Sequence, residues 1–357
     1  MRISFIIPFI NWTGGIRIVF EYAERLHQRG HEVSIYFPMF PYRFSDRLYT
    51  LHGLRRWVGD LVLNLRRRAR QKWFRLSAPL IMVPWISDHF VSDGDAVIAT
   101  AWPTAYSVHR LSRSKGTKFY FVQQYESWSG PQDAVDSSYR LPLHKIAAAS
   151  WLSRLITERF GEPVLDTIIQ GVNFALFYPD GRSAEQTKRV LMQYSPLEWK
   201  GLADGFRAWE IVQQRCPWAR LVMFGMKRGP GVPPNVEFYE DPPQDELRRI
   251  YSSCDIFVST SWIEGCQLPP MEAMACQCAV VATNVGGVPD YTIPGQTALV
   301  VEPRDVNAMA EAIIRLLQND DERQRIAQAG YQYIKQFTWD RAVERFEAAL
   351  ERGIGLL

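Results

Sequence analysis

The sequence alternates short apolar runs with helical stretches, and this order constrains the fold more than any other feature. Residues 3–7 are typical of a buried parallel strand, residues 16–30 of a helix that ends at Gly30, and residues 31–36 of a second strand. A strand, a helix and a further strand form a βαβ unit, which begins a parallel sheet with helices on both faces. The first part of the chain is therefore expected to be α/β.

The same alternation begins again in the second half of the chain. Residues 189–192 and 220–225 are typical of strands, and residues 202–216 lie between them as an expected helix. The chain is long enough for two domains of ordinary size. Further strands are expected at 95–100, 118–122, 167–169, 255–259 and 279–282, and further helices at 145–160, 245–252 and 270–276. We expect one domain at 1–170, a second at 171–337, and a final helical stretch at 338–357.

Two glutamates, Glu264 and Glu272, lie eight residues apart around a loop with one glycine and two prolines. The run from Met271 to Ala275 consists of good helix formers, so a helix is expected to begin here. The loop's N–H groups and the helix N-terminus together suit an anion such as a diphosphate. The carboxylates on either side can accept hydrogen bonds from vicinal hydroxyls. The segment therefore suits a sugar nucleotide.

Residues 264–276 resemble the donor-binding signature of the retaining glycosyltransferases of family four. In that family the stretch is approximately Glu-Gly-Phe-Gly-Leu-Pro-Pro-Leu-Glu-Ala-Met-Ala, and here Cys266 and Gln267 replace the Phe and the second Gly. Residues 286–290 add to the resemblance, which extends over about residues 1–350. It implies the GT-B fold, in which two Rossmann-like domains face each other across a cleft. The final helix is expected to cross back onto the first domain.

The resemblance also implies roles for particular residues. Lys200 follows the first strand of the second domain, and it would hold the leaving diphosphate as a mobile positive charge. An Arg usually precedes this Lys by about five residues, where this chain has Tyr194 or Ser195. Glu264 would bind sugar hydroxyls, and Glu272 would bind the ribose diol. Lys200 and Glu264 are the expected catalytic residues.

Other expected contacts come from loops and from a short strand. A glycine pair after the first strand lets a bound group approach the backbone closely. Residues 235–240 resemble the strand and turn whose backbone reads the base, although an ordinary edge strand fits as well. Where many family members have a His that contacts the donor sugar, this chain has Gln123 and Gln124. The expected donor-binding residues are Gly14, Gly15, Lys200, Tyr239, Glu264, Gly265, Cys266, Gln267, Leu268 and Glu272.

Charge is distributed unevenly along the chain. Residues 1–170 carry 22 Lys and Arg against 14 Asp and Glu, whereas the rest of the chain is net acidic. Residues 55–75 are basic and tryptophan-bearing, which fits an interfacial membrane helix or, alternatively, a core-packed helix with a solvated basic face. The expected membrane contacts are Trp57, Arg66, Arg67 and Arg68. No nucleic-acid-recognition motif is visible, so a nucleic-acid partner is not expected.

The sequence therefore predicts a hexosyltransferase that moves glucose from a UDP-sugar to a saccharide acceptor, expected to be lipid-linked, in envelope or extracellular polysaccharide synthesis. GDP-mannose and dTDP-rhamnose remain alternative donors. A soluble sugar-phosphate synthase, an epimerase and a non-catalytic sugar-nucleotide scaffold remain alternative functions. The five cysteines and the absence of a signal core favour a cytoplasmic protein, with peripheral binding to the inner membrane face as a further expectation. The resemblance implies no essential metal and no cofactor.

Overall fold

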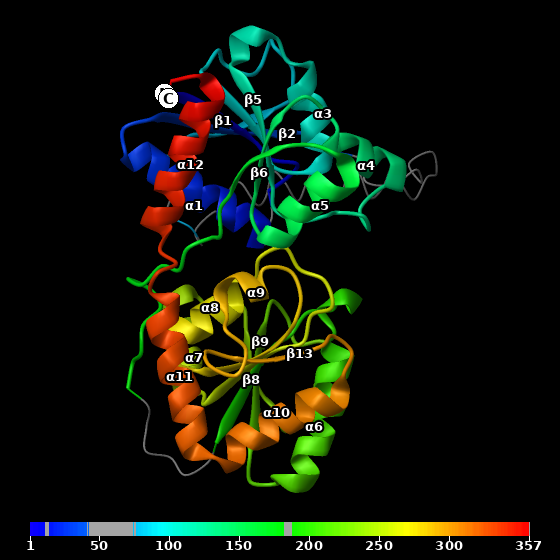
Figure 1. The fold of residues 1–357 in the computed structure, drawn as a ribbon, viewed down its shortest axis with the longest axis vertical. Coiled ribbons are helices and arrows are strands. Elements are labelled where there is room, and N and C mark those ends of the chain that lie inside the picture. Colours follow the sequence, from blue (N-terminus) through cyan, green and yellow to red (C-terminus); the bar gives the residue numbers. More distant parts are fainter. Residues whose placement is uncertain (11–13, 41, 43–73, 75, 182–187, 357) are drawn as a thin grey trace. The chain divides into compact units, whose positions relative to one another are not determined.

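The computed structural model describes residues 1–10, 14–40, 42, 74, 76–181 and 188–356 (Figure 1). These residues form two compact units. The first unit comprises Met1–Ile168 together with Asp340–Leu357, and the second comprises Ile169–Trp339. The last segment of the chain thus belongs to the unit that the first segment begins.

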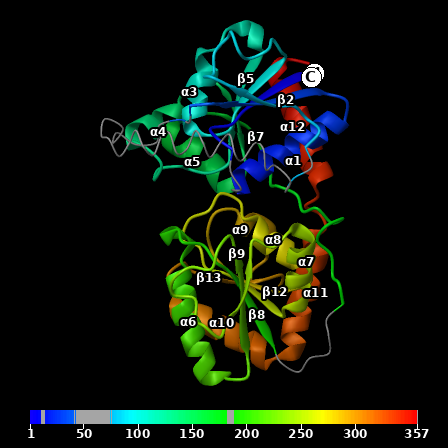
Figure 2. The ribbon, with the colours of Figure 1, turned by 180° about the vertical axis from the view of Figure 1, so that it is seen from behind.

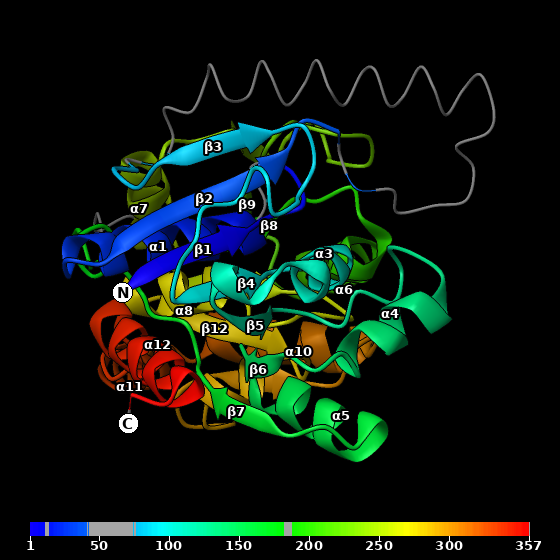
Figure 3. The ribbon, with the colours of Figure 1, turned by 90° about the horizontal axis from the view of Figure 1, so that it is seen from above.

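A seven-stranded parallel sheet forms the centre of the first unit, in the order β3-β2-β1-β4-β5-β6-β7 (Figure 3). The strands are β1 Arg2–Ile6, β2 Glu32–Pro38, β3 Leu80–Val83, β4 Ala96–Ala99, β5 Thr117–Val122, β6 His144–Ala147 and β7 Val164–Thr167. The helices are α1 Gly14–Gln28, α3 Trp102–Arg110, α4 Gln132–Tyr139, α5 Ser150–Phe160 and α12 Trp339–Ile354, with the short η2 Arg113–Lys115. The expected βαβ unit at the start of the chain is β1, α1 and β2.

Aromatic packing ties α12 to the first unit. The Phe346 ring lies 4.5 Å from that of Tyr22 on α1, 5.3 Å from that of Phe121 on β5, and 6.1 Å from that of Phe5 on β1, measured between ring centroids. All four side chains are almost fully buried. Burial of large aromatic rings dominates core energetics, so this contact explains why the last helix belongs to the first unit.

The expected helix at 145–160 is wrong in its first part. His144–Ala147 forms strand β6, and the helix α5 begins only at Ser150. Periodicity cannot separate a short buried strand from a helical segment. The charge of the buried Lys145 is satisfied within the strand's surroundings, because its Nζ donates to Leu141 O at 2.8 Å and to Glu162 Oε2 at 2.6 Å.

The second unit is built on a six-stranded parallel sheet in the order β10-β9-β8-β11-β12-β13. The strands are β8 Arg189–Gln193, β9 Arg220–Gly225, β10 Glu237–Glu240, β11 Ile256–Ser259, β12 Ala279–Thr283 and β13 Leu299–Val301. The helices are α6 Leu202–Arg215, α7 Gln244–Ser253, α8 Leu268–Ala275, α9 Val288–Tyr291, α10 Val306–Gln318 and α11 Asp320–Ile334, with η3 Glu198–Lys200. One face is covered by α6 and α10, and the other by α7, α8 and α11 (Figure 2).

The helix expected at 270–276 begins two residues earlier, at Leu268. Pro269 and Pro270 occupy its second and third positions, where a residue needs no intrahelical N–H donor. The prolines are thus part of the first turn and do not precede it. As a consequence, Glu272 is the fifth helical residue and lies two residues deeper in the helix than expected.

Within the part of the chain that the structure describes, no helix is long and apolar enough to span a bilayer. The expected membrane contacts Trp57, Arg66, Arg67 and Arg68 lie outside the described residues.

Candidate active site

Lys200 and Glu264 meet at the carboxyl edge of the second unit's sheet. Lys200 ends η3, which follows β8, and Glu264 lies in the loop after β11. These strands are neighbours, so the loops that follow them lie together. Lys200 Nζ is 2.5 Å from Glu264 Oε1, and Ser261 Oγ donates to the same oxygen at 2.7 Å. Glu264 is buried and Lys200 is partly exposed, so a charged pair is positioned at the surface of this edge.

The backbone around Lys200 holds the two loops together. Thr260 Oγ1 donates to Lys200 O at 2.6 Å, and Trp262 N donates to Trp199 O at 2.7 Å. Gly201 has φ +63°, and a Cβ there would lie 2.0 Å from Thr260 O. Only glycine fits this close approach, which fixes Lys200 beside the β11 loop.

The N-terminus of α8 lies in the same loop. Because its second and third residues are prolines, the N–H groups available at this end are those of Gln267 and Leu268. The Gln267 side chain is buried and its Oε1 accepts a hydrogen bond from Ser259 Oγ at 2.9 Å. The residue that replaces the family's second glycine therefore points its amide inward, toward β11. The backbone of the loop provides the donors for an anion.

Gly286 and Gly287 pack behind this loop. Gly286 has φ +57°, and a Cβ there would lie 2.5 Å from Glu264 O and 2.6 Å from Gly265 O. Gly287 N donates to Gly265 O at 2.7 Å. Burial raises the pKa of the neighbouring Cys266 thiol, which favours its neutral form.

Glu272 lies in the interior of the second unit, on the first two turns of α8. Its side chain is almost fully buried, and Oε2 accepts a hydrogen bond from Tyr251 OH at 3.3 Å. Tyr251 belongs to α7 and was not singled out from the sequence. Since Tyr251 is itself a fully buried aromatic residue, its only sequence signal is that of an ordinary core position.

Tyr239 is not brought to the Lys200 and Glu264 pair. It lies on the edge strand β10, which is three strands away from β11, or about 14 Å at ordinary strand spacing. Its hydroxyl donates to Glu237 Oε1, which also accepts from Arg189 Nη2 at 2.9 Å. These two partners lie toward the amino ends of their strands, so the Tyr239 hydroxyl points away from the carboxyl edge.

Tyr194 and Ser195, which stand where the family has an arginine, are both engaged locally. The Tyr194 hydroxyl lies against Gly229, where an added Cβ would be 1.6 Å away, and Ser195 Oγ accepts from Leu197 N at 3.4 Å. A different cation lies at the carboxyl edge. The Arg304 guanidinium is 4.3 Å from the centre of the Trp262 ring. Arg304 follows β13, and no motif in the sequence pointed to it.

In the first unit, one expected glycine and one expected glutamine, Gly15 and Gln123, lie close together. Gly14 and Gly15 begin α1, and a Cβ on Gly15 would lie 3.6 Å from Gln123 Oε1. In the sheet order β4 separates β1 from β5, so the loops after β1 and β5 leave the same edge two strand positions apart. The backbone O of Gln124 accepts a hydrogen bond from Tyr139 OH at 3.1 Å.

Glu126 follows these glutamines and was not selected from the sequence. Its Oε2 accepts from Trp102 N, the first residue of α3, at 2.8 Å. Burial raises the pKa of Glu126 to about 7, and the hydrogen bond from Trp102 offsets only part of that effect. Glu126 therefore changes charge near neutral pH, at the carboxyl edge of the first unit's sheet.

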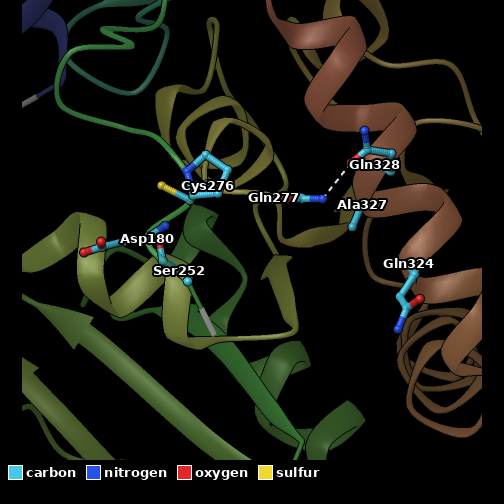
Figure 4. Close-up of a pocket in the computed structure, with 9 residues that line it drawn as sticks. Asp180, Ser252, Cys276, Gln277, Gln324, Ala327 and Gln328 are labelled. Carbon is cyan, nitrogen blue, oxygen red and sulfur yellow. Dashed lines mark hydrogen bonds between the residues drawn. The ribbon is translucent and has the colours of Figure 1, made fainter. Parts of the chain in front are cut away.

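A separate cavity of about 430 Å³ lies in the second unit, at the C-terminal end of α8 (Figure 4). Its lining includes Cys276 and Gln277, and Gln277 Nε2 donates to Gln328 Oε1 at 2.6 Å. An eight-residue helix is about 12 Å long, so this cavity is distinct from the loop at the N-terminus of α8. Among the described residues, no three His, Cys, Asp or Glu side chains are grouped so that they could hold a metal ion.

The segment that contains these residues is similar to a known protein family. Residues 188–319 match the family described as Glycosyl transferases group 1. The second unit is similar to group 1 glycosyl transferases. The matched segment contains β8 to α10, and with them Lys200, Glu264 and Glu272.

Two curated relatives agree with this match. D-inositol 3-phosphate glycosyltransferase of Corynebacterium diphtheriae is 29% identical over 208 residues, which are 51% of this chain and 49% of the relative. O-antigen chain mannosyltransferase B of Escherichia coli is 30% identical over 159 residues, which are 44% of this chain and 39% of the relative. The chain thus spans about half the length, or less, of the curated relatives it matches.

Solved structures confirm the expected GT-B fold, with two Rossmann-like domains. Sucrose-phosphate synthase from Thermosynechococcus elongatus has a TM-score of 0.74 at 16% identity, with 100% of each chain covered. HepE of Anabaena in complex with UDP has a TM-score of 0.74 at 13% identity, with 99% of this chain and 100% of that chain covered. At these identities the likeness concerns the fold alone.

Proposed function

We propose that the protein is a retaining glycosyltransferase that moves a hexose from a nucleotide-sugar to a saccharide acceptor. The observation that supports this most is the Lys200–Glu264 pair beside the N-terminus of α8, within a segment that matches the group 1 family. We propose glucose as the hexose and a UDP-sugar as the donor. The acceptor is a lipid-linked saccharide in envelope or extracellular polysaccharide synthesis.

The proposed chemistry depends on stabilising the leaving diphosphate. Lys200 would exchange its contact with Glu264 for a phosphate oxygen, and the N–H groups of Gln267 and Leu268 would donate to the same group. The bond between the anomeric carbon and the phosphate oxygen breaks as the acceptor oxygen approaches from the same face. The acceptor's proton passes to the leaving phosphate, so no protein nucleophile is needed.

The carboxylates would then position the donor. Glu264, released from Lys200 but still bonded to Ser261, accepts hydrogen bonds from sugar hydroxyls. Glu272 is proposed to contact the ribose diol, for which its buried carboxylate must become accessible through the α8 loop. On this mechanism the protein needs neither a metal ion nor a cofactor, and the only nucleotide is the co-substrate.

Support for the UDP-sugar comes from HepE of Anabaena, which has been solved with UDP and with UDP-glucose. A second function has support of its own. The names of two similar proteins, sucrose-phosphate synthase and D-inositol 3-phosphate glycosyltransferase, each include a small phosphorylated compound. The alternative function is therefore transfer to a small phosphorylated acceptor without membranes. An acceptor screen has to distinguish it from transfer to a lipid-linked saccharide. We place the protein in the cytoplasm, at the inner membrane face when its acceptor is lipid-linked.

A thermal-shift screen against UDP, GDP, dTDP and their common sugars tests the proposal. We expect a rise of several degrees in melting temperature with UDP and UDP-glucose, because a ligand that binds only the folded state stabilises it. A shift confined to GDP or dTDP compounds would correct the base. If no nucleotide changes the melting temperature, the donor site does not function and the scaffold alternative gains support.

A further inference from the structure

Trp128 is partly exposed, and its backbone is anchored. The residue is 40% exposed and lies on the segment 123–131 between β5 and α4. This segment leaves the sheet at its carboxyl edge, where open parallel α/β sheets bind their ligands. An exposed tryptophan on a rigid segment at a ligand-binding edge is a candidate contact for a substrate.

The local hydrogen bonds make the segment a defined turn. Ser129 N donates to Glu126 O at 3.0 Å, and Ser129 Oγ donates to the same oxygen at 2.8 Å. A bond from the fourth residue back to the first closes a β-turn, with Trp128 in its third position. The turn places Trp128 at its tip.

A second tryptophan, Trp102, contacts the turn and holds its position. Its Nε1 donates to Ser129 Oγ at 2.9 Å, and its backbone N donates to Glu126 Oε2 at 2.8 Å. A Cβ on Gly130 would lie 2.5 Å from Trp102 Cζ2, so the turn rests directly on the indole ring. Trp102 is only 7% exposed, whereas Trp128 is 40% exposed. Trp102 is part of the core, whereas Trp128 is partly accessible to solvent.

The residue before the turn is fixed as well. Tyr125 OH donates to Asp136 Oδ1 on α4 at 2.7 Å, and Arg159 Nη2 donates to Asp136 Oδ2 at the same distance. Because the turn is held from α3 and from α4, ordering it on binding adds little entropic cost. Preorganisation of this kind favours affinity.

We propose that Trp128 is a stacking platform for a pyranose ring of the saccharide acceptor. This inference rests on the proposed function, to which it adds a subsite in the first unit. A pyranose has an apolar C–H face bordered by hydroxyls, and an indole offers a flat apolar surface at low cost in side-chain entropy. Gln123 and Gln124 belong to the same segment, 123–131, and both are partly exposed.

Charge favours a sugar over a lipid surface at this position. Residues 123–136 contain Glu126, Asp133 and Asp136 and no lysine or arginine. An anionic membrane surface attracts basic segments, and this segment has no basic residue of its own. A neutral, hydroxylated ring does not require one.

The experiment measures binding of the full chain to an array of defined hexose-containing oligosaccharides, and UDP binding by thermal shift in parallel. The variants are Trp128→Ala, Trp128→Phe and Trp218→Ala. Trp218 is a matched control, because it is 46% exposed and precedes β9 at the opposite edge of the second unit's sheet. We expect ~10-fold weaker glycan binding for Trp128→Ala, as the loss of an aromatic contact of about 1.4 kcal/mol implies.

The outcomes separate this inference from the proposed function. Retained glycan binding in Trp128→Phe and Trp218→Ala, with UDP binding unchanged in all variants, would support the platform. Equal glycan binding by Trp128→Ala and the wild type would overturn it, as would a wild-type protein that binds no oligosaccharide while it still binds UDP. Glycan binding that depends on Trp128 in a protein that binds no nucleotide would support the platform and contradict the proposed transferase.

Discussion

At the scale of single residues, variants of Lys200 and Glu264 are expected to distinguish phosphate binding from sugar binding. Lys200→Ala is expected to weaken UDP and UDP-glucose equally, by ~10- to 100-fold, because a hydrogen bond to a charged group contributes about 1.5–3 kcal/mol. Glu264→Gln should leave UDP binding intact or improve it, since Lys200 loses its competing partner, and should reduce the preference for UDP-glucose. Calorimetry on both ligands measures these effects.

The control for this pair is Lys188→Ala. Lys188 precedes β8 in the second unit, and its Nζ is 3.1 Å from Asp320 Oδ2. It has the same charge and lies at the amino edge, away from the α8 loop. If Lys188→Ala weakens UDP binding as much as Lys200→Ala does, the effect is one of general charge and the role assigned to Lys200 is wrong.

Glu126 gives the first unit a pH dependence. Its pKa in the folded protein is raised to about 7 from an ordinary value of 4.5, so the folded state holds this proton more tightly than the unfolded state. Its contribution to stability is complete below pH ~4.5 and is lost as the pH rises to ~7, by about 1.4 kcal/mol for each unit within that window. Glu126→Gln, which keeps an acceptor for Trp102 N, should remove this loss.

Urea unfolding at pH 5 and pH 8, with hydrogen exchange in α3 to follow the first unit, measures the Glu126 effect. The wild type should lose more stability than Glu126→Gln between these two values. Glu158→Gln, which changes an exposed carboxylate on α5, should behave like the wild type. Parallel pH profiles for the wild type and Glu126→Gln would show that the carboxyl titrates normally.

At this scale the sequence was most informative where backbone chemistry is restrictive. The glycine and prolines of 264–272 predicted a loop and a helix N-terminus, and Lys200 and Glu264 do lie together there. The contacts made by Trp262, Arg304 and Glu126 could not be predicted, because each depends on a partner that is distant in the sequence. The position of Tyr239 three strands away follows from strand order, which a sequence alone does not contain.

At the scale of elements, the loop before α8 depends on Gly286. Gly286→Ala combines a positive φ with a Cβ 2.5 Å from Glu264 O, so the loop has to move. We expect a loss of about 1–3 kcal/mol in the free energy of unfolding and a marked loss of UDP binding. Gly295→Ala is a matched control, because Gly295 has φ +73° with nothing within 4 Å of its added Cβ.

Thermal unfolding and UDP calorimetry on both glycine variants distinguish strain from displacement. Gly295→Ala should lose stability through its backbone conformation and keep its affinity for UDP. If Gly286→Ala also binds UDP as the wild type does, the α8 loop does not form the donor site.

Elements with clear boundaries, such as β1, α1 and β9, were predicted correctly, whereas the short β6 was predicted as helix because burial on both faces removes the strand periodicity.

At the scale of the whole molecule, α12 makes the first unit depend on the last residues of the chain. Phe346→Ala removes the ring that contacts Phe5, Tyr22 and Phe121, so it should destabilise the first unit by about 3–5 kcal/mol. Hydrogen exchange should accelerate in β1 and β5 and remain unchanged in β8 and β11, which belong to the second unit's own core.

The matched control for Phe346→Ala is Leu356→Ala, which lies beyond α12 and is 63% exposed, and it should leave exchange unchanged. Equal acceleration of exchange in both units would mean that they unfold as one body, and the division into two compact units would then have no thermodynamic counterpart. Faster hydrogen exchange in the first unit alone would show that its two chain segments, which are separated in sequence by the whole second unit, form one core. UDP binding by Phe346→Ala should then persist at temperatures that unfold the first unit, because Lys200 and the α8 loop, which are proposed to hold the diphosphate, lie in the second.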